Sequence, residues 1–206
     1  MSRIFAYDSP ITTFLTRLGE LLILNLLWLI CCIPVFTIGP STTAMNAVAH
    51  QLVLDECPGV IKEFFRFFRR DFKQAFFLGL IFVAVCAVLG AEIYWVISLS
   101  RSDTILVIWC IAAVFMCFIF SYAFPLMAHF DNTLFRTLKN AMILSIGRLP
   151  RTIALCILNL LPLLMALFWT QAFLIVLPFW LVLGCSVICY LDHLLLRPLF
   201  EKLQGE

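Results

Sequence analysis

Five long apolar runs, separated by short polar segments, dominate the pattern of hydrophobic and polar positions along this chain. They cover residues 18–38, 76–98, 104–130, 152–169 and 173–196. A helix needs about 20 apolar residues to cross the hydrocarbon core of a bilayer. The pattern therefore predicts an all-α membrane protein with five transmembrane helices, in which residues 1–206 form a single helical domain.

The polar segment before the second run has the period of an amphipathic helix between residues 60 and 77. Its apolar face carries Ile61, Phe64, Phe65, Phe68, Phe72 and Phe76. Its polar face carries the cations Lys62, Arg66, Arg69, Arg70 and Lys73, together with Glu63 and Gln74. Such a helix is typical of the membrane–water interface, so we expect an elbow that lies on the bilayer before the chain turns in. A second, weaker elbow is expected in the stretch 131–151, with an apolar face of Leu134, Phe135, Leu138 and Met142.

Prolines and glycines mark where these helices begin and end. Ser9 before Pro10 favours a helix start, and Pro34 is expected to kink or end the first span. The segment from Thr42 to Leu54 has thirteen residues and would reach about 20 Å as a helix, too short to cross. Whether it lies on the bilayer or dips into it is open from the sequence.

The basic residues are distributed unevenly among the loops. The first loop, the third loop and the C-terminal tail together carry eleven Lys and Arg residues, whereas the N-terminal segment and the other two loops carry three. Cytoplasmic loops are enriched in Lys and Arg. We therefore expect the two elbows and the C-terminus inside the cell and the N-terminus outside.

Composition agrees with a multi-pass protein of the cell membrane. The chain is 64% hydrophobic and 13% charged, whereas a soluble domain has about 25% charged residues. Eight of the nine cysteines lie inside apolar runs, and the exception is Cys57. No pair has C-x-x-C spacing, so we interpret them as packing residues rather than as disulfide or metal ligands. No sequence motif for a nucleotide, a catalytic zinc or a serine nucleophile is present. We expect neither an enzyme, nor a cofactor, nor a nucleic-acid partner.

Five polar residues in or beside the spans are candidates for function. Glu92 is the one acid well inside a span, where a charge is costly. His129, Asp131, Asp192 and His193 fall at the expected inner ends of the third and fifth spans, and could form a proton relay or bind a metal if those ends meet. The competing interpretations are an interfacial or protonated Glu92, and helix caps at the other four positions.

Several stretches resemble the YesL-like family of bacterial membrane proteins, a domain family of unknown function. The resemblance lies in residues 25–34, 37–44, 64–75 and 124–132, and from 139–141 through 149–151. It implies a multi-pass topology and a genetic neighbourhood of carbohydrate ABC importers and polysaccharide utilisation. It supplies no catalytic residue.

Two main hypotheses about function follow. The first is a non-enzymatic accessory protein that assembles with another membrane protein, for which the resemblance suggests a carbohydrate importer. The alternative is a small transporter or channel in its own right, and an intramembrane enzyme built on the His and Asp residues comes third. A homo-oligomer is compatible with either main hypothesis.

Overall fold

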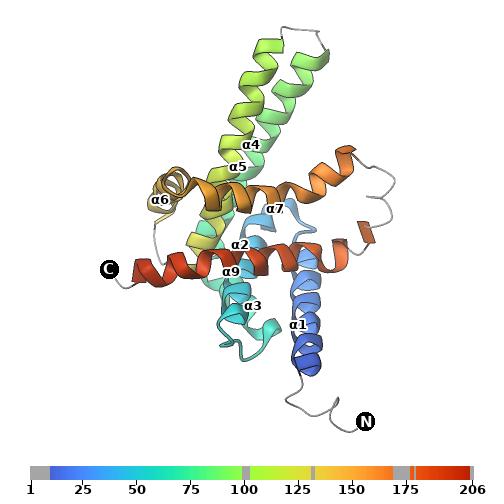
Figure 1. The fold of residues 1–206 in the computed structure, drawn as a ribbon, viewed down its shortest axis with the longest axis vertical. Coiled ribbons are helices and arrows are strands. Elements are labelled where there is room, and N and C mark those ends of the chain that lie inside the picture. Colours follow the sequence, from blue (N-terminus) through green and yellow to red (C-terminus); the bar gives the residue numbers. More distant parts are fainter. Residues whose placement is uncertain (1–9, 99–102, 131–132, 169–176, 179, 205–206) are drawn as a thin grey trace.

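The computed structural model describes residues 10–98, 103–130, 133–168, 177–178 and 180–204, and within these ranges it contains helices and no strand (Figure 1). The elements, in chain order, are α1 (Pro10–Cys31), the 3₁₀ turn η1 (Val35–Thr37), α2 (Ile38–Val53), α3 (Val60–Arg70), α4 (Phe72–Ser98), α5 (Asp103–His129), α6 (Leu134–Gly147), α7 (Leu149–Phe168), the π-helical turn η2 (Trp180–Gly184) and α9 (Cys185–Gln204). The predicted start at Pro10 is confirmed, and α1 ends at Cys31, before Pro34.

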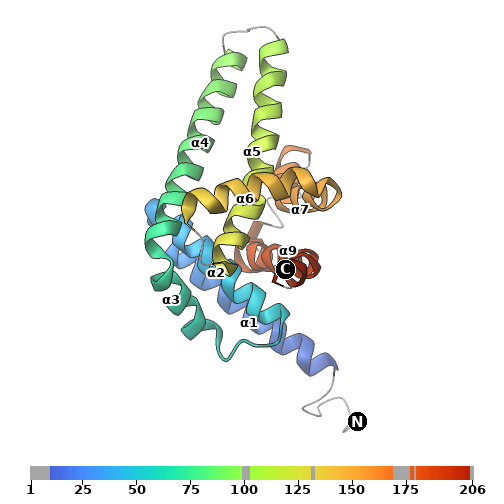
Figure 2. The same ribbon diagram turned by 90° about the vertical axis from the view of Figure 1, so that its left-hand side faces the viewer.

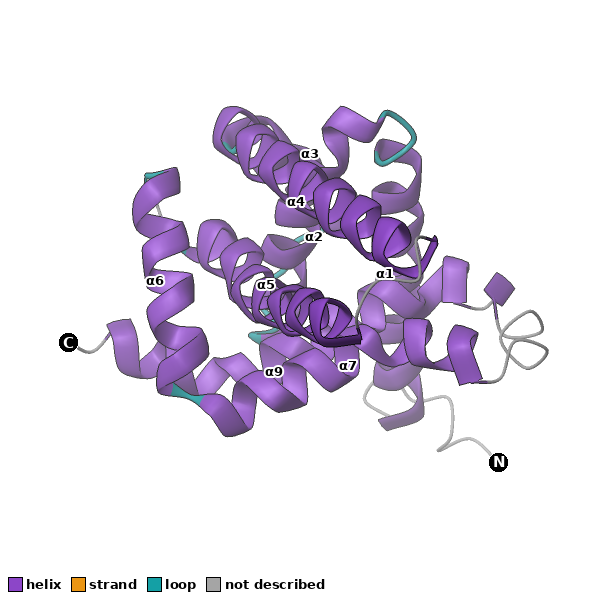
Figure 3. Cartoon of the chain, turned by 90° about the horizontal axis from the view of Figure 1, so that it is seen from above, coloured by secondary structure: helices purple, strands orange, loops and turns teal. Residues whose placement is uncertain are grey.

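Helices α4 and α5 form a long hairpin that extends well beyond the other helices (Figures 1 and 2). Helices α6, α7 and α9 run crosswise to it, and the view along the hairpin shows them side-on around its base (Figure 3). Helices α1 and α3 extend to the opposite end of the molecule, and α2 packs on both of them. The α4–α5 hairpin is therefore the part of the chain with the least protein around it.

Three described helices are long and apolar enough to cross a membrane: Thr12–Cys32, Phe72–Val96 and Val107–His129. A fourth is obtained only if Leu134–Gly147 and Leu149–Leu160, which meet at 106°, count as one broken span. The predicted class, an all-helical protein with several membrane-spanning helices, is thus confirmed. The fourth and fifth predicted spans, 152–169 and 173–196, remain predictions, and part of the fifth lies outside the described residues.

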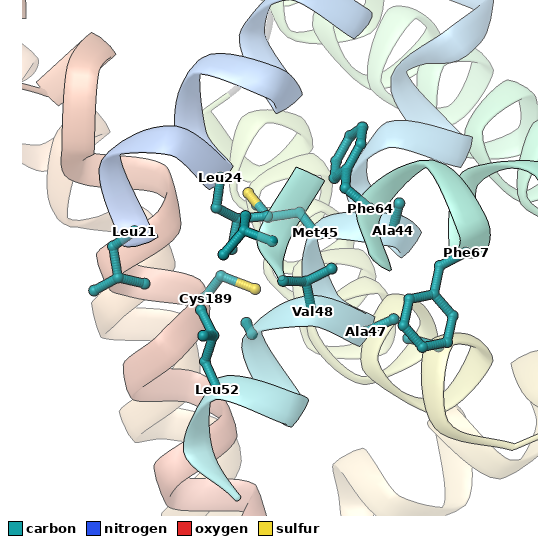
Figure 4. Close-up of a cluster of buried hydrophobic side chains, with 13 residues drawn as sticks. Leu21, Leu24, Ala44, Met45, Ala47, Val48, Leu52, Phe64, Phe67 and Cys189 are labelled. Atoms are coloured by element: carbon teal, nitrogen blue, oxygen red, sulfur yellow. The ribbon is translucent and has the colours of Figure 1, made fainter. Parts of the chain in front are cut away.

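Helix α2 lies at the centre of the molecule. Twelve of its sixteen residues are buried, and it contacts α1, α3, α4, α5 and α9. Figure 4 shows Met45 and Val48 of α2 between Leu24 of α1 and Phe64 of α3, all at most 5% exposed. The segment expected to lie on the bilayer or dip into it is instead enclosed by the protein's own helices.

Two glycines allow α2 to approach α4 very closely. A Cβ atom added to Gly79 would lie 2.5 Å from the Cα atom of Gly39, and one added to Gly39 would lie 2.0 Å from the carbonyl oxygen of Ala75. No side chain fits there, so the backbones themselves are in contact. Small residues at helix crossings are the usual means of close packing within membranes.

The first elbow is two helices rather than one. Helix α3 ends at Arg70 and α4 begins at Phe72, with Asp71 between them outside helical geometry. The predicted phenylalanine face continues through the break: ring centroids are 6.2 Å apart for Phe64–Phe68, 5.5 Å for Phe68–Phe72 and 6.3 Å for Phe72–Phe76. The guanidinium of Arg70 holds the break, since it donates to both carboxylate oxygens of Asp71.

The assignment of Glu63 to the polar face was wrong. Glu63 is 1% exposed and Phe67 is 7% exposed, so both belong to the face that packs on the protein. Arg66 lies within ion-pair distance of the Glu63 carboxylate, and the guanidinium groups of Arg66 and Arg70 each lie 4.8 Å from the Phe67 ring centroid. The buried face is shifted because α2 covers it, a contact that periodicity alone does not reveal.

Helix α6 also presents a different face from the one expected. Its buried residues are the small ones, Thr137, Ala141 and Ser145, whereas Phe135 is 81% exposed. The helix lies against the middle of the α4–α5 hairpin, where Lys139 lines a groove together with Ile81 and Met116. The predicted apolar face is divided: Leu134 and Leu138 pack partly against the core, whereas Phe135 and Met142 are exposed.

One ion pair bears on the orientation of the first span. Arg17, near the start of α1, contacts the carboxylate of Asp55 in the turn between α2 and α3. Helix α2 turns back along α1, so that both lie at the same end of the molecule (Figure 2). This contact does not fit the expected arrangement, in which the N-terminal segment and the first loop lie on opposite sides of the bilayer.

Candidate functional site

The three histidines of the chain meet where α2, α5 and α9 come together. The ring centroid of His50, at the end of α2, lies 4.4 Å from that of His129 and 5.4 Å from that of His193. His129 and His193 were candidates for one site if the ends of their spans met, and the structure joins them through His50. His50 was not a candidate, because the sequence left open where its helix lies.

The orientation of the His193 ring is fixed by Asn46, one turn before His50. The Asn46 amide nitrogen donates to the carbonyl oxygen of Thr42 at 2.8 Å, which leaves its oxygen as the acceptor toward His193 at 3.2 Å. His193 Nε2 therefore carries a proton. This contact joins α2 to α9 inside the protein, where both side chains are at most 6% exposed.

His50 is held in its neutral form. Burial, with the nearby positive charges of His129 and Arg197, lowers the pKa of His50 to about 4. Among the described residues, no three His, Cys, Asp or Glu side chains are arranged to hold one metal ion. The histidine cluster is a packed contact between three helices, in which His50 is neutral at neutral pH.

Asp192 faces the other way from its neighbour His193. Its Oδ2 atom accepts a hydrogen bond of 2.8 Å from the Asn159 amide of α7, which also donates to the carbonyl oxygen of Leu155. The side chain is 6% exposed, and its Oδ1 atom has no hydrogen-bond partner within the described part of the chain. The structure thus separates the predicted group: Asp192 is not part of the histidine cluster.

Asp192 lines a cavity of about 220 Å³ between α1, α2, α5, α7 and α9. Its aromatic walls are Trp28, Phe120, Phe124 and Trp180, and its other polar residues are Thr42, Asn46, Ser121 and Asn159. Trp180 reaches the cavity from η2 because its ring folds back over Gly184, where an added Cβ would lie 2.6 Å from the ring. This cavity, with its buried carboxylate, is the candidate functional site.

The remaining candidates lie elsewhere. Glu92 is in the last two turns of α4, in the extended part of the hairpin, and lines neither the cavity nor the histidine cluster. Asp131 lies outside the described residues. Of the basic residues of the elbow, Arg69, Arg70 and Lys73 line a separate groove of about 480 Å³, while Lys62 and Arg66 are exposed on α3.

Asn25, a polar residue inside the first apolar run, makes a second buried polar contact with α9. Its side-chain oxygen accepts a 2.9 Å hydrogen bond from the backbone N–H of Ser186, in the first turn of α9. The π-helical turn before α9 changes the main-chain bonding pattern there, so an external acceptor is needed. The hydrogen bond fixes α1 to the beginning of α9.

These features define a multi-pass helical membrane protein with a buried polar core. The family model described as "Protein of unknown function, DUF624" matches residues 21–93. The uncharacterized protein YteU of Bacillus subtilis is 34% identical over 160 residues, 73% of this chain and 68% of YteU. The uncharacterized protein YesL of the same organism is 27% identical over 152 residues, 72% of either chain. The chain belongs to this YesL-like family of unknown function, as its sequence motifs indicated, and no solved structure matches it significantly.

Proposed function

We propose that this chain is a non-catalytic accessory protein that assembles with another membrane protein, a carbohydrate ABC importer. The family resemblance suggests the kind of partner. The observation that carries the assembly role is the exposed face of α4, which none of the other described helices covers.

This face runs the length of the hairpin and has small residues at its centre. Phe77 and Leu80 are more than half exposed near the elbow, as is Trp95 near the tip. Between them the exposed positions Ala84, Ala87, Gly90 and Ala91 carry little or no side chain. Apolar surface alone indicates no partner, because lipid can cover it, but a stripe of small residues favours close contact with a second helix.

The basic elbow supports the same role at the base of the hairpin. Lys62, Arg69 and Lys73 are exposed, and Arg69 and Lys73 line the 480 Å³ groove with Arg70. A partner with acidic side chains at this level would be attracted by these charges, an effect that weakens with salt.

Co-purification tests the proposal. The tagged chain is isolated from native membranes in mild detergent, and recovered importer subunits are quantified by mass spectrometry. Replacing Ala87 and Ala91 with Leu should reduce recovery at least fivefold, because the added side chains hold the partner helix away. Neither position is covered within this chain, so the melting temperature should change little.

The matched control is Phe77→Leu, a change at an exposed position of the same face that leaves the small stripe intact. Recovery with this variant should equal wild type. Equal recovery with the double Leu variant, or the absence of an importer from the wild-type sample, would contradict the proposal. A second copy of the chain in its place would indicate self-association through this face.

The cavity beside Asp192 favours a second candidate, a small transporter. This alternative requires that pure protein in vesicles moves a substrate unaided. Flux from vesicles that contain only this chain, abolished by Asp192→Asn, would favour it over the accessory role.

A further inference from the structure

The cavity beside Asp192 combines a buried acid with an environment that contains no cation. Asp192 is 6% exposed, and its one described hydrogen-bond partner, Asn159, is a neutral amide. None of the described residues that line the cavity is Lys, Arg or His. An ionised carboxylate buried without a counter-charge is strongly disfavoured, so a cation bound beside Asp192 would stabilise the ionised form.

The Asp192 carboxylate has capacity for a further hydrogen-bond partner, because its buried Oδ1 atom has none among the described residues. Asn159 orients the carboxylate through Oδ2 and leaves Oδ1 without a described partner, on a residue that lines the cavity. Of the neighbouring acceptors, the Asn46 oxygen is already engaged by His193 and the Thr42 hydroxyl by the indole N–H of Trp28 at 3.2 Å. Few oxygens remain, whereas a hard metal ion requires about six.

We propose that this cavity binds a small organic cation of the alkylammonium class, with Asp192 as its counter-ion. An alkylammonium needs only one carboxylate, and its alkyl part matches the apolar walls. Trp28, Phe120, Phe124 and Trp180 line the cavity, and aromatic faces attract ammonium groups, most strongly in sites without water. The volume of about 220 Å³ suffices for a small ligand, since about 150 Å³ can hold benzene.

This inference is independent of the proposed accessory role, because none of the described residues that line the cavity belongs to α4. It assigns a ligand class to a cavity that lies between five helices. Occupancy would therefore stabilise the contact of α7 and α9 with α1, α2 and α5.

The test compares a charged probe with a neutral one of nearly the same shape. The full chain in lipid nanodiscs is titrated with tert-butylammonium and, separately, with tert-butanol, by calorimetry and by thermal unfolding. Tert-butylammonium should bind saturably and raise the melting temperature, and tert-butanol should bind at least about tenfold more weakly, a difference of about 1.4 kcal/mol.

Three variants locate the site. Asp192→Asn should weaken tert-butylammonium binding at least tenfold while leaving tert-butanol unaffected, and Glu92→Gln, in the extended hairpin, should bind as wild type. Ile188→Phe, which fills the cavity from its wall and keeps the carboxylate, should also abolish binding. It decides the question if Asp192→Asn does not fold.

Equal affinity for the two probes would overturn the proposal and leave an apolar cavity without charge selectivity. Wild-type affinity in Asp192→Asn or in Ile188→Phe would place the ammonium elsewhere and overturn it as well. So would the absence of saturable binding by tert-butylammonium to wild type.

Discussion

Asn25 and Asn46 illustrate how buried amides organise this protein at the scale of single residues. Each offers its oxygen to α9, Asn25 at Ser186 and Asn46 at His193, and each lies inside an otherwise apolar environment. A buried hydrogen bond in a membrane protein contributes about 1 kcal/mol, but losing one partner leaves the other unsatisfied. Specific polar pairs of this kind favour one arrangement of the helices over the others that apolar contacts alone would allow.

Replacing Asn25 with Ala should destabilise the protein by about 1–3 kcal/mol, because the Ser186 N–H loses its acceptor while still buried. Thermal unfolding in detergent measures the change. Thr16→Ala on the same helix is the control: its hydroxyl bonds to the Thr12 carbonyl within α1 and is exposed, so the effect should stay below about 0.5 kcal/mol. Similar losses in the two variants would argue against this role for Asn25.

His50 makes stability depend on pH. Its pKa is lowered to about 4 in the folded protein, against about 6.5 in an unfolded chain. The unfolded state therefore binds more protons between these values, so stability is complete above about pH 7 and is lost as the pH falls toward 4. Unfolding midpoints measured from pH 8 to pH 4 should drop below pH 6.5, and His50→Gln should show a shallower dependence. An identical pH profile in the variant would show that His50 does not contribute.

The glycine contact between α2 and α4 yields a prediction at the scale of elements. Gly79→Ala should cost about 1–3 kcal/mol, because the new methyl group meets the backbone of Gly39. Gly90→Ala on the same helix has open space around it and should be neutral or slightly stabilising, since Ala favours helix over Gly by about 1 kcal/mol. A lower melting temperature for Gly79→Ala, together with an unchanged or higher one for Gly90→Ala, would support the contact. Equal changes in the two variants would refute it.

Individual helices were largely predictable from the sequence, whereas their buried faces were not. The boundaries of α4 and α5 follow from the apolar runs at 76–98 and 104–130 and from the polar turn between them. Glu63 was assigned to the wrong face, Phe67 to neither, and the place of α2 was left open, because burial there comes from neighbouring helices rather than from the local period. The same limit explains His50, which becomes a candidate only when α2 is seen at the centre.

At the scale of the whole molecule, the pairing of Arg17 with Asp55 leads to a revised topology. The structure places the start of α1 and the α2–α3 turn at one end and the tip of the α4–α5 hairpin at the other. Reporters at the N-terminus and inserted after Gly59 should therefore lie in the same compartment, and a reporter after Arg101 in the opposite one. Because cytoplasmic segments are enriched in Lys and Arg, we expect the first compartment, which holds the basic elbow, to be the cytoplasm. An N-terminal reporter outside the cell would instead support the topology expected from the sequence.

The candidate site could not be assembled from the sequence because its members come from five helices. Asp192 was a candidate, but its partner Asn159 and the aromatic walls are spread from Trp28 to Trp180. Periodicity identifies helices and leaves open which of them meet. The packing of α7 on α5 and of α9 on α2 is of this kind, since no period reveals that Asn25 and Asn46 both meet α9.

The central position of α2 constrains how the chain matures during its synthesis. Helix α2 is synthesised soon after α1, yet its Asn46 can contact His193 only after a further 147 residues have been made. Until then its polar side chains, and Asn25 of α1, lack the partners that α9 supplies. Helix α9 thus completes the core. A nascent chain that stops before residue 185 lacks this helix and presents an incomplete polar core to the insertion machinery.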